Sequence, residues 1–121
     1  MDRAAVTPSL YVPDVTAAVR FYADHFGCEQ AGGWEEAGAL VWAEISRGDA
    51  RLWFFSAPLP DEPLPRFSGL IYLFTDNVTA LANTLRDRLP FEWGPEDQAY
   101  GLHDLCIRDL NGYRLVFAED R

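Results

Sequence analysis

Hydrophobic and polar residues alternate most clearly near the C-terminal end of the sequence. Two alternating runs, 102–108 and 113–117, flank the segment Asp109-Leu110-Asn111-Gly112. Alternation with a period of two is typical of a strand with one buried face. Asp, Asn and Gly favour a turn between two such strands. The segment is therefore predicted to be a β-hairpin.

The last strand of this hairpin has a counterpart 63 residues earlier in the chain. Arg114-Leu115-Val116-Phe117 follows the same pattern as Arg51-Leu52-Trp53-Phe54, and the same offset aligns two Val-Thr-Ala segments at 15–17 and 78–80. Because several blocks agree at one offset, the chain is predicted to contain two copies of one unit. The hairpin turn of the second copy is expected to be one residue longer.

Each copy is predicted to contain one strand, one helix and then three strands. Asp14 is placed to cap a helix whose apolar stripe runs to Phe26, and Gly27 would end it. In the second copy, Asp76 or Asn77 would cap the helix and Pro90 would end it. The other strands are expected at 6–12, 28–31, 39–46, 51–56, 67–75, 91–93 and in the hairpin, with a turn at 32–33 and a loop at 94–98.

A chain of 121 residues is the size of one domain, so the two copies are expected to share one fold. The prediction is a single domain over residues 1–121 with modules at 6–57 and 67–119. A Pro-rich linker, 58–66, would join the modules, because Pro excludes regular structure. The fold class is predicted to be α+β, with two βαβββ modules in tandem.

The net charge of the chain limits the classes of partner that it is expected to bind. The sequence carries a net charge of −9, and every basic residue is Arg. A uniformly acidic surface repels phosphate backbones, so no nucleic-acid partner is expected. The same charge favours solubility and would attract a cationic small molecule. No membrane segment or signal-peptide pattern is recognised, and Cys28 and Cys106 form no CxxC motif, so a reduced, cytoplasmic location is expected.

Several of these motifs resemble the vicinal oxygen chelate superfamily, which includes glyoxalase I, extradiol dioxygenases and bleomycin-resistance proteins. The resemblance is carried by Tyr11-Val12-Pro13-Asp14-Val15, by Phe26-Gly27 and by the hairpin at 109–117, where Leu110 replaces a Pro of the family's turn. It implies a cupped mixed sheet around a cavity, with the helices on the outside. It also implies a symmetric homodimer, in which a partner would cover exposed strand edges.

The resemblance further implies where a metal ion would be held in the metal-dependent members. Those positions in this sequence are Thr7, Trp53, Leu70 and Val116. A catalytic ion needs about three ligands such as imidazole or carboxylate, which these side chains do not offer. We therefore expect no metal and no cofactor, and binding in preference to catalysis.

The cavity face is expected to be aromatic with a few charges, because residues two apart in a strand share a face. The predicted ligand-binding residues are Trp42, Glu44, Trp53, Phe55, Tyr72, Tyr100, Asp104 and Arg114. Aromatic faces would stack on a flat ligand, and the two carboxylates would attract a positive group. The alternatives are that the aromatic residues only fill the barrel, and that the carboxylates pair with Arg51 or Arg114.

No Ser-His-Asp or Cys-His pattern is recognised. His25 is expected on the exposed side of the first helix and His103 on the helix-facing or edge side of its strand, so neither is expected to act as a base. Cys106 is expected to be a small apolar filler. The predicted function is a metal-free small-molecule-binding protein of the bleomycin-resistance type, associated with antibiotic resistance, that sequesters an aromatic or cationic compound. The alternatives are a glyoxalase- or dioxygenase-like enzyme of unknown substrate and a regulatory or structural dimer module without a ligand.

Overall fold

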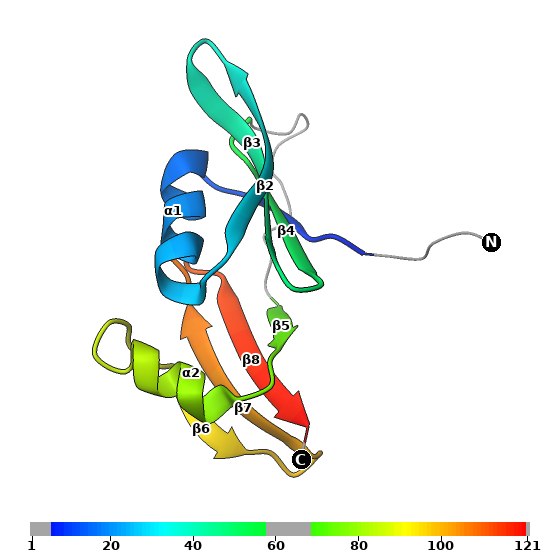
Figure 1. Cartoon of the computed structure of the whole chain (residues 1–121), viewed down its shortest axis with the longest axis vertical. Coiled ribbons are helices and arrows are strands. Elements are labelled where there is room, and N and C mark those ends of the chain that lie inside the picture. Colours follow the sequence, from blue (N-terminus) through cyan, green and yellow to red (C-terminus); the bar gives the residue numbers. More distant parts are fainter. Residues whose placement is uncertain (1–5, 58–68, 121) are drawn as a thin grey trace, which may run out of the picture. The chain divides into compact units, whose positions relative to one another are not determined.

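The computed structural model of the chain describes residues 6–57 and 69–120, which fall into two compact units (Figure 1). The first unit contains β1 (Ser9–Tyr11), α1 (Val15–Phe26), β2 (Glu29–Glu36), β3 (Ala39–Arg47) and β4 (Ala50–Phe55). The second contains β5 (Leu70–Phe74), α2 (Val78–Leu85), β6 (Trp93–Asp97), β7 (Leu102–Arg108) and β8 (Arg114–Asp120). The predicted α+β class and the tandem βαβββ order are confirmed. The predicted linker at 58–66 lies outside the described residues.

The two units have the same sheet topology. The strand orders are β1-β4-β3-β2 and β5-β8-β7-β6, with the first pair parallel and the others antiparallel. Ser9 pairs with Trp53 in the first sheet, and Tyr72 pairs with Val116 in the second, which is the same pairing 63 residues later. The internal repeat predicted from sequence is therefore a structural repeat.

Both helices begin at the same point of the repeat. Asp14 Oδ1 accepts a hydrogen bond from the Ala17 amide at 3.0 Å, and Asn77 Oδ1 accepts one from the Ala80 amide at 2.9 Å. Asn77, not Asp76, is therefore the cap of α2. Gly27 ends α1 in the left-handed conformation that glycine adopts without steric cost. The second helix ends at Leu85, ahead of the predicted stop at Pro90.

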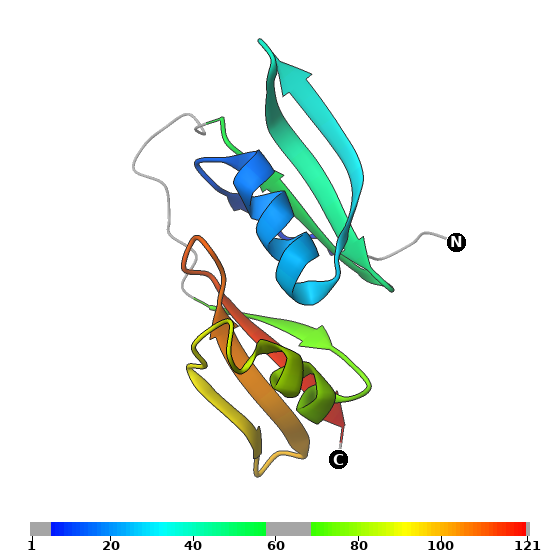
Figure 2. The same cartoon turned by 60° about the vertical axis from the view of Figure 1, so that its left-hand side comes forward.

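In each unit the helix lies on one face of its sheet (Figure 2), and buried hydrophobic side chains fill the space between them. The buried residues of the first core are Leu10, Val12, Val15, Ala18, Tyr22, Phe26, Ala43, Ile45, Leu52 and Phe54. Those between α2 and its sheet are Ile71, Val78, Ala82, Leu85, Leu105, Ile107, Leu115 and Phe117. Because strand residues alternate, the neighbours of these residues in each strand lie on the opposite face, which we call the open face of each sheet.

The predicted turn at Gly32-Gly33 is wrong, because both residues lie inside β2. The chain reverses instead at Ala37-Gly38, where φ is positive at both residues. The Trp42 side chain on β3 packs against this part of β2. A Cβ atom on Gly32 would lie 3.5 Å from the ring of Trp42, so this ring lies directly over the strand. The register also shifts between Gln30 and Gly32, as at a β-bulge.

The predicted loop at 94–98 is also wrong, since β6 runs from Trp93 to Asp97. The strand accommodates Gly94 and Pro95 at a register shift between Trp93 and Glu96. A Cβ atom on Gly94 would collide with the carbonyl oxygen of Asp104 on β7, so the backbones approach closely here. Pro is tolerated at a bulge in an edge strand because it needs no ladder partner there. In the part of the chain that the structure describes, no helix is long and apolar enough to cross a membrane.

Candidate functional site

The open face of the first sheet carries a row of aromatic side chains. The register of β1, β4, β3 and β2 places four such residues side by side, namely Tyr11, Phe55, Trp42 and Trp34. In the next row, Trp53 on β4 lies opposite Glu44 on β3. Three predicted aromatic residues, Trp42, Trp53 and Phe55, therefore share this face, as predicted.

The aromatic rings of this face pack against one another and remain partly accessible. Trp42 and Trp53 meet edge to face with ring centroids 5.2 Å apart, and Tyr11 and Phe55 do so at 5.9 Å. Trp34 is 64% exposed, and Tyr11 and Trp53 are also exposed. Apolar rings that remain this accessible are typical of a binding surface. Trp34 is not among the predicted site residues; its pairing with Trp42 depends on β2 continuing through the glycines.

Glu44 has two partners on this face. Its Oε2 atom accepts a hydrogen bond from the Trp53 indole N–H at 3.1 Å and lies 3.4 Å from Arg51 Nη1. The Glu44 carboxylate orients the Trp53 ring, and the Arg51 guanidinium compensates the negative charge of Glu44. The alternative for Glu44, an ion pair with Arg51, is confirmed.

The open face of the second sheet combines aromatic, small and charged side chains. The register places Tyr72, Val116, Cys106 and Trp93 in one row and Phe74, Ala118, Asp104 and Glu96 in the next. The predicted site residues Tyr72 and Asp104 therefore lie on one face, together with Arg114. The small residues in the centre of the rows are buried, whereas Tyr72 and Phe74 near the edge are exposed.

Asp104 is buried and bonded to neutral donors. Its Oδ1 atom accepts hydrogen bonds from the Trp93 indole N–H at 3.1 Å and from Gln98 Nε2 at 2.9 Å. Its Oδ2 atom is buried without a hydrogen-bond partner. The alternative of an ion pair with Arg114 does not apply, because Arg114 bonds elsewhere.

Arg114 belongs to a cluster with Glu92 and Arg108. One carboxylate oxygen of Glu92, Oε1, accepts hydrogen bonds from the Nε atoms of both arginines at 2.9 Å. The bonds from Arg114 and then Arg108 hold the pKa of Glu92 below its usual value. Arg114 keeps its remaining guanidinium N–H groups on a side chain that is 40% exposed.

Tyr100 lies in the connection between β6 and β7 and is 66% exposed. A hydrogen bond with Tyr72 raises the pKa of Tyr100, and the charges of Asp104 and Glu96 add to this effect. Tyr100 and Tyr72 are therefore hydrogen-bonded neighbours.

The structure offers little for nucleophilic or metal chemistry on these faces. Burial raises the pKa of Cys106 to about 11, and the same cause raises the pKa of Cys28 to about 11, so both are thiols at neutral pH. Thr7 precedes β1, and the other three positions implied for a metal carry Trp53, Leu70 and Val116. Over residues 6–57 and 69–120, no three His, Cys, Asp or Glu residues are grouped so that they could hold a metal ion.

A histidine pairing that sequence reasoning missed lies at His103. Its Nδ1 atom is 2.7 Å from Asp97 Oδ1, and its Nε2 atom is 3.5 Å from Thr79 Oγ1. The three side chains resemble a catalytic triad in order, although the bond to Thr79 is long. His103 pairs in register with Glu119, whose Oε1 atom accepts from the first amide of α2, so the group lies on the helix side of its sheet as expected for His103. The sequence pattern hides this pairing, because it predicts a loop at Asp97.

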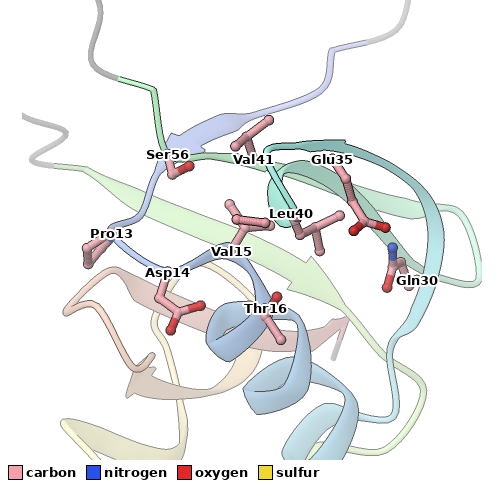
Figure 3. Close-up of a pocket in the computed structure, with 11 residues that line it drawn as sticks. Pro13, Asp14, Val15, Thr16, Gln30, Glu35, Leu40, Val41 and Ser56 are labelled. Carbon is pink, nitrogen blue, oxygen red and sulfur yellow. The ribbon is translucent and has the colours of Figure 1, made fainter.

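A hollow of about 740 Å³ lies on the first unit (Figure 3), and no residue of the aromatic row lines it. It is bordered by the start of α1, with Asp14 and Thr16, and by the β2–β3 hairpin, with Glu35 and Leu40. Asp14 is already engaged as the helix cap. None of the predicted site residues lines this hollow, so it is a separate feature.

Comparison with protein families gives one match over nearly the whole chain. The family model described as Glyoxalase/Bleomycin resistance protein/Dioxygenase superfamily matches residues 2–117. No curated protein sequence matches the chain.

Solved structures resemble the chain over almost its full length. TioX from Micromonospora sp. ML1 has a TM-score of 0.78 at 16% identity, with 98% of this chain and 97% of that chain covered. Lactoylglutathione lyase from Agrobacterium tumefaciens has 0.73 at 23% identity, with 98% and 94% covered. A bleomycin-binding protein from bleomycin-producing Streptomyces verticillus, complexed with copper(II)-bleomycin, has 0.71 at 19% identity, with 100% and 99% covered. At these identities the likeness concerns the fold.

Proposed function

The chain belongs to the Glyoxalase/Bleomycin resistance protein/Dioxygenase superfamily, and on that premise we propose that it is a metal-free protein that binds and sequesters an aromatic or cationic organic compound. The observation that carries the proposal is the partly exposed aromatic row on the open face of the first sheet. A flat ligand stacked on such rings gains about 0.5–1.5 kcal/mol per ring pair beyond the burial of its area.

The hydrogen bond from Trp53 to Glu44 supports this proposal because it prepares the surface for a ligand. An indole ring held by a carboxylate loses little conformational freedom on binding, and preorganisation of this kind raises affinity. The similar protein from Streptomyces verticillus is complexed with copper(II)-bleomycin in its solved structure. That likeness makes a large organic ligand a reasonable choice for the first trials here.

The residues at the metal positions favour binding over catalysis. Trp53, Leu70 and Val116 present no carboxylate or imidazole to an ion, and Glu44 is occupied by Arg51 and Trp53. The likeness to lactoylglutathione lyase favours a second candidate, an enzyme of the glyoxalase type. Measurement of bound metal after incubation with divalent ions separates the two, since about one tightly held ion per chain would favour the enzyme.

We propose further that the chain forms a cytoplasmic homodimer. Phe74 is exposed on β5, which is an edge strand of the second sheet, and Leu70 on the same strand is exposed too. Exposed apolar side chains on an unpaired strand edge are typical of a surface that a partner covers. Sedimentation should give a dimer at micromolar concentration, and Phe74→Glu should shift it toward monomer. A wild-type monomer would contradict the proposal.

Binding is tested by calorimetric titration with planar cationic, neutral and anionic aromatic compounds, including a bleomycin-type glycopeptide. We expect at least one class to bind and Trp53→Leu to weaken that binding about tenfold. The matched control is Phe21→Leu, an aromatic truncation on α1 whose ring packs against His25 away from the open face. If no class binds the wild-type protein, or both variants weaken binding equally, the proposed function is wrong.

A further inference from the structure

Asp104 has an unsatisfied buried carboxylate oxygen. Two acidic residues of the described segments are buried, Asp104 and Asp109. Asp109 is explained by its turn, where Oδ1 accepts from the amides of Asn111 and Tyr113. Asp104 Oδ2 has no hydrogen-bond partner. Because a buried polar atom without a partner costs free energy, such an atom in a folded protein calls for a specific reason.

The charge of Asp104 is also uncompensated by the described residues around it. Its two donors, the Trp93 indole and the Gln98 amide, are neutral. Arg114 and Arg108, which lie on the same face of the sheet, both bond to Glu92 instead. A buried carboxylate without a cationic partner is destabilising, and a cation that donates an N–H to Oδ2 would remove both costs at once.

The two predicted carboxylates therefore differ in what they can do. Glu44 accepts from Trp53 and lies beside Arg51, so a ligand cation would have to displace an existing partner. Asp104 offers a free lone pair and an uncompensated charge. A divalent metal is a poor match for Asp104, since the residues with described positions contain no metal-binding group and one carboxylate does not suffice.

Tyr72 and Tyr100 supply the surroundings that an organic ammonium group requires. Tyr72 shares the open face of the second sheet with Asp104. Tyr100 bonds to Tyr72, and the charge of Asp104 is among the smaller causes that raise the pKa of Tyr100. Phenol rings attract cations through their faces. Since Oδ2 is buried, a ligand reaches it only after a side chain moves. Tyr100 is exposed, and Gly101 beside it has open space around its Cβ position.

We propose that Asp104, with Tyr72 and Tyr100, forms a subsite for a primary or secondary ammonium group of an organic ligand, bound through a hydrogen bond to Oδ2. This inference rests on the proposed binding function and specifies its ligand class. It predicts that the ligand must carry both a positive charge and an N–H donor. A neutral compound lacks the charge, and a quaternary ammonium lacks the donor.

The test compares three compounds that share a 1-naphthylmethyl group by calorimetric titration: 1-naphthylmethylamine, 1-naphthylmethanol and (1-naphthylmethyl)trimethylammonium. We expect the wild-type protein to bind the amine about tenfold more tightly than the other two. Asp104→Asn keeps a side-chain oxygen for Trp93 and Gln98 and should remove this preference. Glu36→Gln, the same change of charge at the exposed end of β2 and outside the proposed site, should keep it.

The outcomes separate the subsite from the wider function. Equal binding of all three compounds to the wild-type protein overturns the ammonium subsite and leaves the binding function intact. An amine preference that survives in Asp104→Asn overturns the role of Asp104. No binding of any of the three compounds overturns the subsite, while the wider ligand panel still decides the binding function. The comparison within the wild-type protein decides the subsite even if the Asp104 variant fails to fold.

Discussion

Arg108 and Arg114 are direct cross-strand partners in the β7–β8 pair, where two like charges oppose each other. Such an arrangement is destabilising by itself. One oxygen of Glu92 relieves it by accepting from both Nε atoms at 2.9 Å. The three residues together carry one excess positive charge and lie at one end of the open face of the second sheet. Arg114, predicted as a ligand contact, therefore also takes part in an ion-pair network with Glu92 and Arg108.

Replacing Glu92 should leave the two arginines opposed without a partner. We expect Glu92→Gln to lower the melting temperature at pH 7. The pKa of Glu92 is depressed in the folded state, so its contribution is present above its usual value of 4.5 and is lost as the pH falls through the folded pKa. The difference in melting temperature between wild type and variant should therefore shrink below pH 4.5. Glu36→Gln, on the exposed end of β2, is the matched control. A difference that grows on acidification would contradict the assignment.

The close approach of β6 to β7 makes a second prediction. Gly94 has φ 84°, and a Cβ atom there would collide with the Asp104 carbonyl oxygen. We expect Gly94→Ala to lower the free energy of unfolding by about 2–4 kcal/mol, measured by denaturant titration. Gly38 has φ 80°, and a Cβ atom there would have no neighbour within 4 Å, so Gly38→Ala isolates the backbone cost of about 1 kcal/mol. Equal losses in the two variants would remove the steric argument.

Two adjacent residues, Asp76 and Asn77, are both of a type that can cap a helix, and Asn77 is the one that caps α2. Asn77 accepts from the Ala80 amide at 2.9 Å, whereas Asp76 makes no such bond. We expect Asn77→Ala to cost about 1 kcal/mol of unfolding free energy. Asp76→Ala should change it little, and Asp14→Ala in the first unit should behave like Asn77→Ala. A larger loss from Asp76→Ala than from Asn77→Ala would contradict the cap.

Sequence reasoning predicted those parts of the fold that depend on local pattern. The 63-residue repeat, the helix starts and the alternation of Arg51, Trp53 and Phe55 all follow from spacing along the chain. It was wrong at Gly32-Gly33, which was interpreted as a turn, and at Gly94-Pro95, which was interpreted as the start of a loop. At Gly94 the absence of a side chain makes room for the Asp104 carbonyl oxygen on the neighbouring strand, whereas a Cβ atom on Gly32 would make only an ordinary contact with the Trp42 ring. Local pattern carries no sign of either contact.

The candidate site shows the same division. Alternation placed Glu44 and Asp104 on open faces, but it could not tell which carboxylate has a cationic partner. That answer depends on cross-strand register, which brings Arg51 to Glu44 and sets Arg114 beside Arg108. The pairing of Asp97 with His103 could not be predicted for the same reason, because it requires β6 to continue to Asp97.

The two cysteines should be unreactive in the folded protein. Burial raises the pKa of Cys28 and of Cys106 to about 11, from a usual value of 9.0. The reactive thiolate is therefore scarce at about pH 8. We expect iodoacetamide to label both residues far more slowly in the native protein than in denaturant, as followed by mass spectrometry.

The raised pKa of the two thiols determines how labelling and stability should change with pH. A raised pKa means that the thiol form stabilises the fold, so this contribution is complete below pH 9 and is lost as the pH rises toward 11. Labelling of the native protein by iodoacetamide should become faster as the pH rises over the same range. Cys28→Ser, at the half-buried position, serves to assign the remaining rate to Cys106. Rapid labelling of Cys106 at neutral pH in the folded protein would mean that the residue is an accessible thiolate, and its assignment as a packed, inert side chain of the open face would be wrong.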